Sequence, residues 1–211
     1  MDVCPTAALK LNGKKYTVEG ALKLALKDKE FYNQSGGGVT FSGGEALCHA
    51  EFISELTDAL HKENVNVALE TCGALPWEKI EKAIGKIDTV LYDVKHMDSA
   101  LHKKYTGMGN ELILENARKI AAVKGGKMII RIPLIGGVNA DTENIRKTGE
   151  FAKEIGVREI HLLPYHRFGE PKYKKLGKQY GGDEFYTPTD EQQEALAAML
   201  KDMGITVDIG G

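Results

Sequence analysis

The sequence predicts an α/β fold with a parallel sheet, because short apolar runs typical of strands alternate with segments of helical periodicity. The connections between them are short, which favours right-handed crossovers between neighbouring strands. The strand-like runs are apolar on both faces, as expected for a sheet that helices cover. Two architectures fit this pattern: an open doubly wound sheet, and a full or partial (β/α) barrel.

The first expected helix covers residues 17–32, with Thr17 as its N-cap and an apolar stripe through Val18, Leu22 and Leu26. The glycine-rich segment 33–38 ends it. The order then continues as strand 39–41, a helix around 52–60, strand 65–69, helix 77–84, strand 89–92, helix 111–123, strand 128–134, helix 141–155, strand 160–163, helix 190–203 and strand 205–209. The segment 169–182, rich in lysine, tyrosine and glycine, breaks the pattern.

Composition excludes several functional classes. A chain of 211 residues is long enough for one or two domains. The net charge of −2, from 28 basic and 30 acidic residues, argues against a nucleic-acid-binding surface. The sequence contains no apolar run of about 18 residues, so no membrane span is expected, and its first residues do not form a secretory signal. Three cysteines are too few for a disulfide framework, which indicates a reduced, cytoplasmic chain.

Polar groups follow or end successive predicted strands. They are Ser42-Gly43-Gly44-Glu45, Glu70-Thr71, Asp93 with Lys95, Arg131, and Tyr165-His166. In both candidate architectures ligands bind at the carboxyl ends of strands. We therefore expect these groups to share one rim of the sheet and to form a ligand site there.

The rim combines acids (Glu45, Glu70, Asp93) with potential cations (Lys95, Arg131, His166), and a zwitterionic amino-acid ligand would satisfy both. The Gly43-Gly44 pair allows close backbone approach to such a ligand. An alternative is a Schiff-base lyase, in which Lys95 would attack a carbonyl substrate.

The cysteines point to different environments. Cys48 and Cys72 are expected to be buried free thiols. Cys4-Pro5 is similar to the end of a bacterial ferredoxin cysteine run, although only three residues precede it here.

Longer stretches resemble one family. They are Gly36-Gly37-Gly38-Val39-Thr40-Phe41-Ser42-Gly43-Gly44-Glu45, Glu70-Thr71-Cys72-Gly73, Tyr92-Asp93-Val94-Lys95, Arg131 through Asn139, and Leu162 through Gly169. Taken in this order they resemble the activating enzymes of glycyl radical enzymes, a branch of the radical S-adenosylmethionine (SAM) superfamily. Cys4-Pro5-Thr6-Ala7-Ala8-Leu9 is similar to the tail of a ferredoxin-like insert found in some members. The resemblance thus divides the chain into an insert remnant at 1–16 and a barrel domain at 17–211.

The resemblance implies a partial (β/α) barrel of the radical SAM type that binds SAM at its strand ends. Gly43, Gly44 and Glu45 match the motif that holds the methionyl amino group, and Asp93 and Lys95 match a pair that contacts SAM. Arg131 and His166 match further SAM contacts, so Lys95, Arg131 and His166 are the expected catalytic residues. Glu70 and Asp93 align with a monovalent-cation site, and Cys4 with a ligand of an insert iron–sulfur cluster.

The activity that the resemblance implies is reductive cleavage of SAM, followed by removal of a hydrogen atom from a backbone glycine of a glycyl radical enzyme such as pyruvate formate-lyase. An electron donor such as flavodoxin or ferredoxin is the second implied partner. Neither nucleic acid nor a membrane is expected to take part.

One departure from the family pattern is large. The family's reactive [4Fe–4S] cluster uses a C-x3-C-x2-C motif after the first barrel strand, and this sequence has cysteines only at positions 4, 48 and 72. The expectation is a chain that begins inside the insert and lacks the first strand and the cluster loop. It should be inactive alone, with the cluster held by a full-length parent.

A non-catalytic module that docks on a glycyl radical enzyme is a further alternative. Smaller departures are Ala46, where proline is frequent, and Glu70, where aspartate is frequent.

Overall fold

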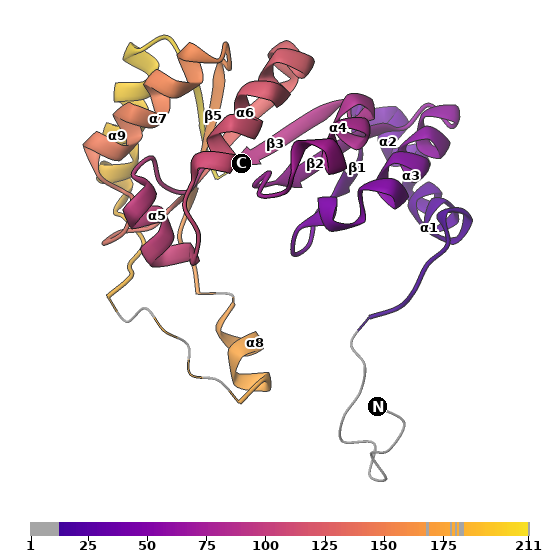
Figure 1. Cartoon of the computed structure of the whole chain (residues 1–211), viewed down its shortest axis with the longest axis horizontal. Coiled ribbons are helices and arrows are strands. Elements are labelled where there is room, and N and C mark those ends of the chain that lie inside the picture. The colour runs from indigo at the N-terminus through magenta and orange to yellow at the C-terminus, as the bar shows by residue number, and fades with distance from the viewer. Residues whose placement is uncertain (1–12, 168, 178, 180, 182–183, 211) are drawn as a thin grey trace.

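The computed structural model describes residues 13–167, 169–177, 179, 181 and 184–210 (Figure 1). Its centre is a six-stranded sheet in which every neighbouring pair is parallel. The strands are β1 (Gly38–Phe41), β2 (Asn66–Thr71), β3 (Thr89–Asp93), β4 (Met128–Leu134), β5 (Glu159–Pro164) and β6 (Thr206–Ile209).

Helices connect the strands throughout. They are α1 (Val18–Ala25), α2 (Lys29–Ser35), α3 (Ala50–Lys62), α4 (Trp77–Lys86), α5 (Ser99–Thr106), α6 (Glu111–Lys124), α7 (Thr142–Glu154), α8 (Glu170–Lys175) and α9 (Asp190–Asp202). Short 3₁₀ turns lie at Leu26–Asp28, Ala46–His49 and Gly125–Lys127.

The strand order decides between the two predicted architectures. The strands lie in chain order from β1 to β6, whereas a doubly wound sheet reverses its order at a switch point. Right-handed crossovers between strands in chain order place the connecting helices on one face of the sheet. Figure 1 shows α3, α4, α6, α7 and α9 on the outer side of a curved sheet. The fold is therefore a partial (β/α) barrel, as the resemblance implied.

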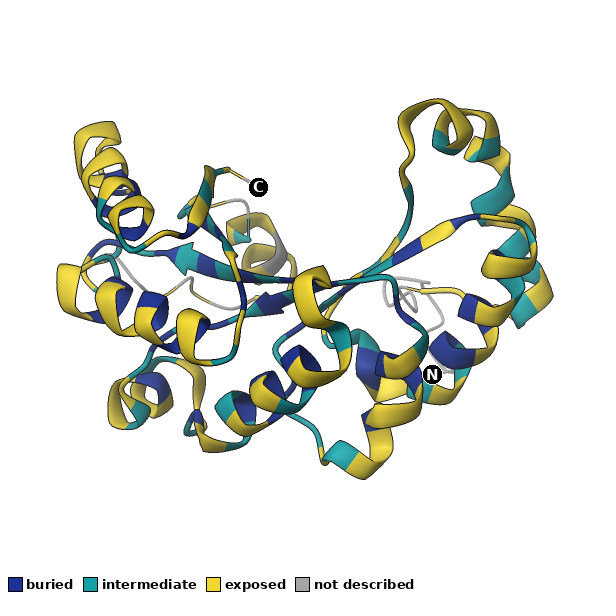
Figure 2. Cartoon of the chain, turned by 90° about the horizontal axis from the view of Figure 1, so that it is seen from above, coloured by how far each residue is buried: buried dark blue, intermediate teal, exposed yellow. Residues whose placement is uncertain are grey.

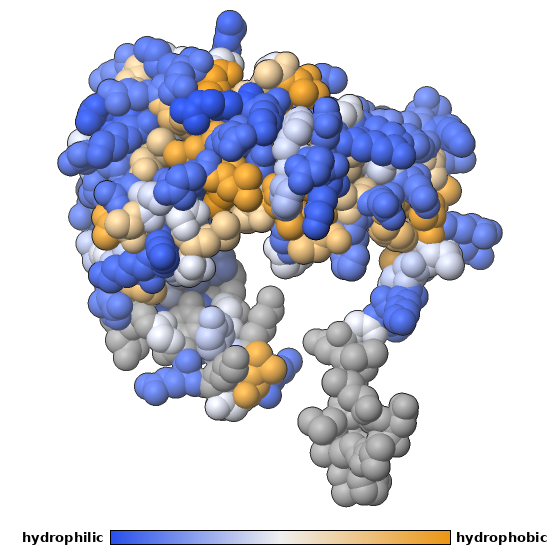
Figure 3. All heavy atoms as spheres, in the orientation of Figure 1, coloured by the Kyte–Doolittle hydropathy of each residue, from blue (hydrophilic) through white to orange (hydrophobic). Residues whose placement is uncertain are grey.

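Alternation along the strands separates two faces, which Figure 2 shows by colour. In β4 the side chains of Ile130, Ile132 and Leu134 are buried, while Arg131 between them is only partly buried. The buried set packs beneath the helices, and the other set lines the open side of the sheet, where the surface is hollowed (Figure 3). The prediction that the strands are apolar on both faces was wrong for this inner face, because none of the helices that the structure describes packs over it and it carries charged side chains such as Arg131.

Local signals explain most of the helix boundaries. Thr17 caps α1 by accepting a hydrogen bond from Gly20 N at 3.1 Å, as predicted. The predicted single helix at 17–32 is instead two helices separated by a 3₁₀ turn. Thr189 and Gln192 form a capping box at the start of α9. The sequence interpretation missed α5, whose eight residues carry few apolar side chains.

Two further observations concern the ends of the sheet and the chain. Among the described residues β1 pairs with β2 alone, so β1 is an edge strand.

The predicted insert remnant falls mostly outside the described residues, and Cys4 lies there too, so the boundary at residue 16 stays a prediction. None of the helices in the described ranges is long and apolar enough to span a membrane.

Candidate functional site

Arg131 is the centre of a charged cluster on the inner face, formed with Glu70 and Asp93. Its Nη1 donates to Glu70 Oε1 at 2.7 Å. Its Nε and Nη2 donate to Asp93 Oδ1 at 3.2 and 3.1 Å. Ser42 Oγ, from the loop after β1, donates to the second oxygen of Glu70. The rim predicted from the sequence therefore exists across β1 to β4.

The register of the sheet explains why these residues meet. Asp93 and Arg131 are direct Cα partners on β3 and β4. Glu70 lies one strand further along, and its long side chain reaches the guanidinium from β2. Since neighbouring parallel strands lie about 4.8 Å apart, side chains on one face at these positions come within contact distance.

The contacts within the cluster favour the charged forms of Glu70 and Arg131. Burial opposes ionisation of Glu70, but hydrogen bonds from Ser42 and Arg131 outweigh it and hold the pKa of the carboxyl below its ordinary value. Burial likewise opposes charge on Arg131, and the charges of Asp93 and Glu70 overcome it and raise the pKa of the guanidinium. The carboxylate of Glu70 is thus available as an anion at neutral pH.

Lys95 extends the cluster beyond the end of β3. Its Nζ lies 3.2 Å from Asp93 Oδ2, so the two side chains share a face as the sequence predicted. The side chain of Lys95 is 39% exposed, compared with 21% for Asp93. An ammonium group carries three donors, and one of those on Lys95 is directed to Asp93. The remaining donors can serve a ligand carboxylate.

Glu45 has a structural task that the sequence did not reveal. One carboxylate oxygen accepts from Leu47 N at 3.1 Å and Thr71 Oγ1 at 2.8 Å. The other accepts from Cys72 N at 3.1 Å and Cys72 Sγ at 3.3 Å. Four bonds fill the acceptor capacity of a carboxylate, so this side chain fastens the loop after β1 to the end of β2.

The glycines beside Glu45 remain open to a ligand. Gly43 adopts φ +131°, a conformation that L side chains rarely adopt. A Cβ placed on Gly43 or Gly44 would meet no atom within 4 Å. The backbone of this loop is therefore better placed than the Glu45 carboxylate to contact an amino group.

The cysteines differ from the prediction of buried thiols. Cys48 is exposed, because it lies on the 3₁₀ turn outside the sheet, and Cys72 is only partly buried. Burial raises the pKa of the Cys72 thiol, with the nearby Glu45 carboxylate acting in the same direction. Within the described residues, no group of three or more His, Cys, Asp or Glu side chains could hold a metal ion. The described part of the chain therefore does not fit a [4Fe–4S] cluster.

Two histidines lie at β5. His166 follows the strand by two residues and is exposed. His161 was missed: its Cα pairs with that of Arg131, its ring lies 2.8 Å from Glu159 Oε1, and its side chain is 15% exposed. Polar residues at alternate positions 159 and 161 of an otherwise apolar run were the signal that could have identified it.

A buried histidine beside Lys95 gives a test of pH dependence. Burial lowers the pKa of His96, although Asp141 and Asp98 act against this, so the folded chain favours the neutral ring. In the unfolded chain the imidazole of His96 binds a proton near its ordinary pKa of about 6.5. Stability should therefore fall as pH drops through that value. Urea midpoints should decline more between pH 7.5 and 5.5 in the wild type than in His96→Asn, and parallel profiles would contradict this assignment.

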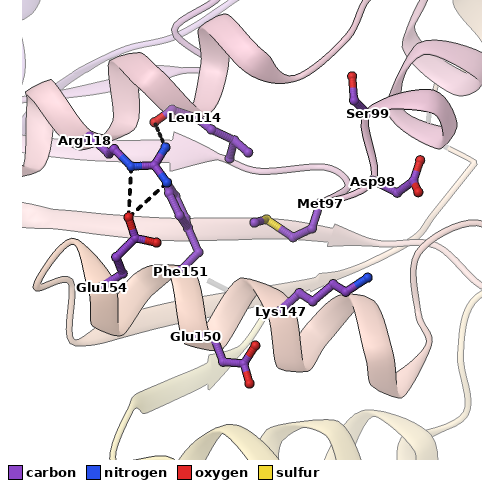
Figure 4. A pocket seen from close by; sticks show the side chains of 9 residues that line it. All are labelled: Met97, Asp98, Ser99, Leu114, Arg118, Lys147, Glu150, Phe151 and Glu154. Carbon is purple, nitrogen blue, oxygen red and sulfur yellow. Dashed lines mark hydrogen bonds and ion pairs between the residues drawn. The ribbon is translucent and has the colours of Figure 1, made fainter.

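Two hollows lie away from the strand ends. A groove of about 510 Å³ lies on the outer surface between α6 and α7 (Figure 4). Arg118 stacks over the Phe151 ring at 4.9 Å there and pairs with Glu154. A second hollow, of about 450 Å³, lies at the amino ends of β1, β2 and β3. Neither contains the charged cluster.

Comparisons with known proteins agree with the geometry. The family model of the radical SAM superfamily matches residues 4–149. The trans-4-hydroxy-L-proline dehydratase activating enzyme of Clostridioides difficile is 39% identical over 207 residues, which cover 97% of this chain and 68% of that protein. The (2S)-3-sulfopropanediol dehydratase activating enzyme of Klebsiella oxytoca is 42% identical over 179 residues, which cover 83% of this chain and 56% of that protein.

A solved structure shares the architecture. A domain of a pyruvate-formate lyase-activating enzyme from Bacteroides vulgatus matches with a TM-score of 0.70 and 35% identity, covering 83% of this chain and all of that one. The chain thus spans about three fifths of the length of the two curated relatives and is similar to a domain that has been solved by itself.

Proposed function

The chain belongs to the radical SAM superfamily, among the activating enzymes of glycyl radical enzymes, and on that premise we propose that it is the SAM-binding barrel of such an enzyme. The observation that carries the proposal is the cluster of Glu70, Asp93, Lys95 and Arg131 at the strand ends. It presents anions and cations side by side, as a methionyl zwitterion requires.

Each group of the site would have a distinct part in binding SAM. Lys95, with donors to spare, would bind the methionyl carboxylate. The backbone of Gly43 and Gly44 would receive the amino group, beside the negative charge of Glu70 and Asp93. Arg131 would hold both acids in place, and His166 would contact the ligand from the end of β5. A monovalent cation near Glu70 and Asp93 remains a prediction, since Arg131 already supplies positive charge to both.

Bound SAM supplies the 5′-deoxyadenosyl group that this family uses for hydrogen-atom abstraction. The donor set of the described residues does not fit the iron–sulfur cluster of the family. The part we assign to this chain is to bind SAM, orient its methionyl end and limit its exposure to water on the inner face.

The partners follow from the proposed class. The relatives are named as activating enzymes of dehydratases, which supports a glycyl radical enzyme as the protein substrate. An electron donor such as flavodoxin or ferredoxin would supply the reducing electron. A reducing cytoplasm remains our expectation, supported by the free thiols of Cys48 and Cys72.

The Schiff-base alternative is not favoured. Imine formation needs a lysine amine activated by desolvation or by another cation. Lys95 is 39% exposed and paired with a carboxylate. Treating the chain with borohydride and simple aldehydes should label Lys95 no faster than other exposed lysines.

The proposal is tested by titrating ligands into this chain. SAM should bind with a measurable dissociation constant in calorimetry. We expect 5′-methylthioadenosine, which keeps the nucleoside but lacks the amino-acid end, to bind at least about tenfold more weakly, because one charged hydrogen bond contributes about 1.5–3 kcal/mol. Equal affinities for SAM and 5′-methylthioadenosine would show that the charged cluster does not bind the methionyl group.

A further inference from the structure

The segment that carries Lys95, residues 94–97 between β3 and α5, is held in place by buried asparagines. We propose that Asn139 is a positioning residue for Lys95: it fixes the Lys95 backbone so that the ammonium group can meet the carboxylate of an amino-acid ligand. This inference rests on the proposed function, because it assigns Asn139 a part in the same site.

Asn139 joins two loops of the rim through its side chain. It lies after β4 and is 1% exposed. Its Nδ2 donates to Lys95 O and to Pro133 O, both at 2.7 Å. Its Oδ1 accepts from Ile135 N at 2.7 Å. Both amide hydrogens and the carbonyl oxygen are therefore engaged, and the side chain ties the end of β3 to the end of β4.

Two more buried asparagines hold the neighbouring residues. Asn144 Oδ1 accepts from Met97 N at 2.9 Å, and its Nδ2 donates to Asn139 O at 3.1 Å. Asn110 Nδ2 donates to His96 O and Met97 O, both at 2.9 Å. The carbonyls of Lys95, His96 and Met97 are thus all bonded to amide side chains from outside the segment.

This arrangement matters for binding because Lys95 lies past the last ladder pair of β3. The strand's last contact with β4 is the bond from Val94 N to Arg131 O at 2.9 Å. Beyond that point, among the described residues, the backbone of residues 95–97 is bonded to asparagine side chains. A lysine side chain is long and loses much conformational freedom when it is ordered. A fixed Cα position reduces the freedom that remains to be lost when the ligand binds.

The chain offers a matched control. Asn116 is also fully buried, and its Nδ2 donates to two loop carbonyls, Gly73 O at 2.7 Å and Leu75 O at 2.8 Å. These carbonyls follow β2 and lie outside the Lys95 segment. Asn116→Ala should therefore cost folding stability much as Asn139→Ala does, without moving Lys95.

The test is a double-mutant cycle read as SAM dissociation constants in calorimetry. Asn139→Ala should weaken SAM binding about tenfold when Lys95 is present and less than about twofold in the Lys95→Ala background, because coupled residues are not additive. Asn116→Ala should leave the affinity within about twofold of wild type. If Asn139→Ala does not fold, Asn144→Ala is measured in its place. It should weaken SAM binding about threefold in the wild-type background and have no effect on SAM binding in the Lys95→Ala background.

The outcomes separate this inference from the proposed function. Equal weakening by Asn139→Ala in both backgrounds, or none in either, would overturn the positioning role while Lys95→Ala still weakens binding. Lys95→Ala without effect would refute the proposed ligand placement, and the positioning role with it. Weakening by Asn116→Ala to the same extent would show a general effect of losing a buried asparagine.

Discussion

Replacing Arg131 by methionine is expected to destabilise the chain by about 3 kcal/mol at pH 7 and to abolish measurable SAM binding. The change leaves the carboxylates of Glu70 and Asp93 facing one another without the guanidinium that now bonds both. Removing one partner from a buried ion pair costs about 3–5 kcal/mol. The lower end applies because these acids are 30% and 21% exposed.

The pH dependence of this loss carries a definite sign. The pKa of Glu70 is lowered in the folded wild type, so its contribution to stability is present above the ordinary pKa and is lost as pH falls through the folded value. The difference in the free energy of unfolding between the wild type and Arg131→Met, measured by urea unfolding, should therefore become smaller below about pH 4.

A surface pair provides the control for Arg131. Arg146→Met removes the exposed pair with Glu150, one helical turn away on α7, and should change stability by less than about 1 kcal/mol. The account would be contradicted if Arg146→Met lost as much stability as Arg131→Met. It would also be contradicted if the difference in unfolding free energy between the wild type and Arg131→Met did not change with pH.

Lys95→Ala is expected to weaken SAM binding by roughly 10- to 150-fold with little change in stability. The physical reason is the loss of a charged hydrogen bond to the ligand carboxylate, about 1.5–3 kcal/mol. This range is smaller than that for a fully desolvated pair, because the side chain is 39% exposed. Calorimetry on the wild type and the variant measures it.

Neighbouring lysines provide the comparison for Lys95. Lys103 and Lys104 lie on α5, and Lys104 stacks over the Tyr105 ring at 4.8 Å. Alanine at either position should leave SAM affinity within about twofold of the wild type. If Lys103→Ala weakened binding while Lys95→Ala did not, the ligand would lie elsewhere.

The sequence predicted the part of the fold that follows from periodicity. Apolar runs gave β4 with its observed ends, because Met128 through Leu134 alternate against one layer of helices. Strand order was not readable from one sequence, since a doubly wound sheet and a barrel use the same alternation of strands and helices. The order β1 to β6 settles that choice in the structure.

Site residues were predictable where a charge stood next to an apolar run. Glu70, Asp93 and Arg131 were identified in this way and do meet. The role of Glu45 was not, because a side chain that accepts from Cys72 N, 27 residues away, leaves no local pattern. Asn139 was missed as a functional residue for the same reason, since its bond to Lys95 O spans 44 residues.

The most direct test of the central claim is a crystal structure of this chain grown with SAM. The account predicts ligand density on the inner face at the carboxyl ends of β2 to β4, with the methionyl carboxylate within hydrogen-bond distance of Lys95 Nζ. It also predicts the amino group beside the Gly43-Gly44 backbone. Density for SAM in the outer groove between α6 and α7, or at the amino ends of the strands, with the Lys95 region empty, would contradict it.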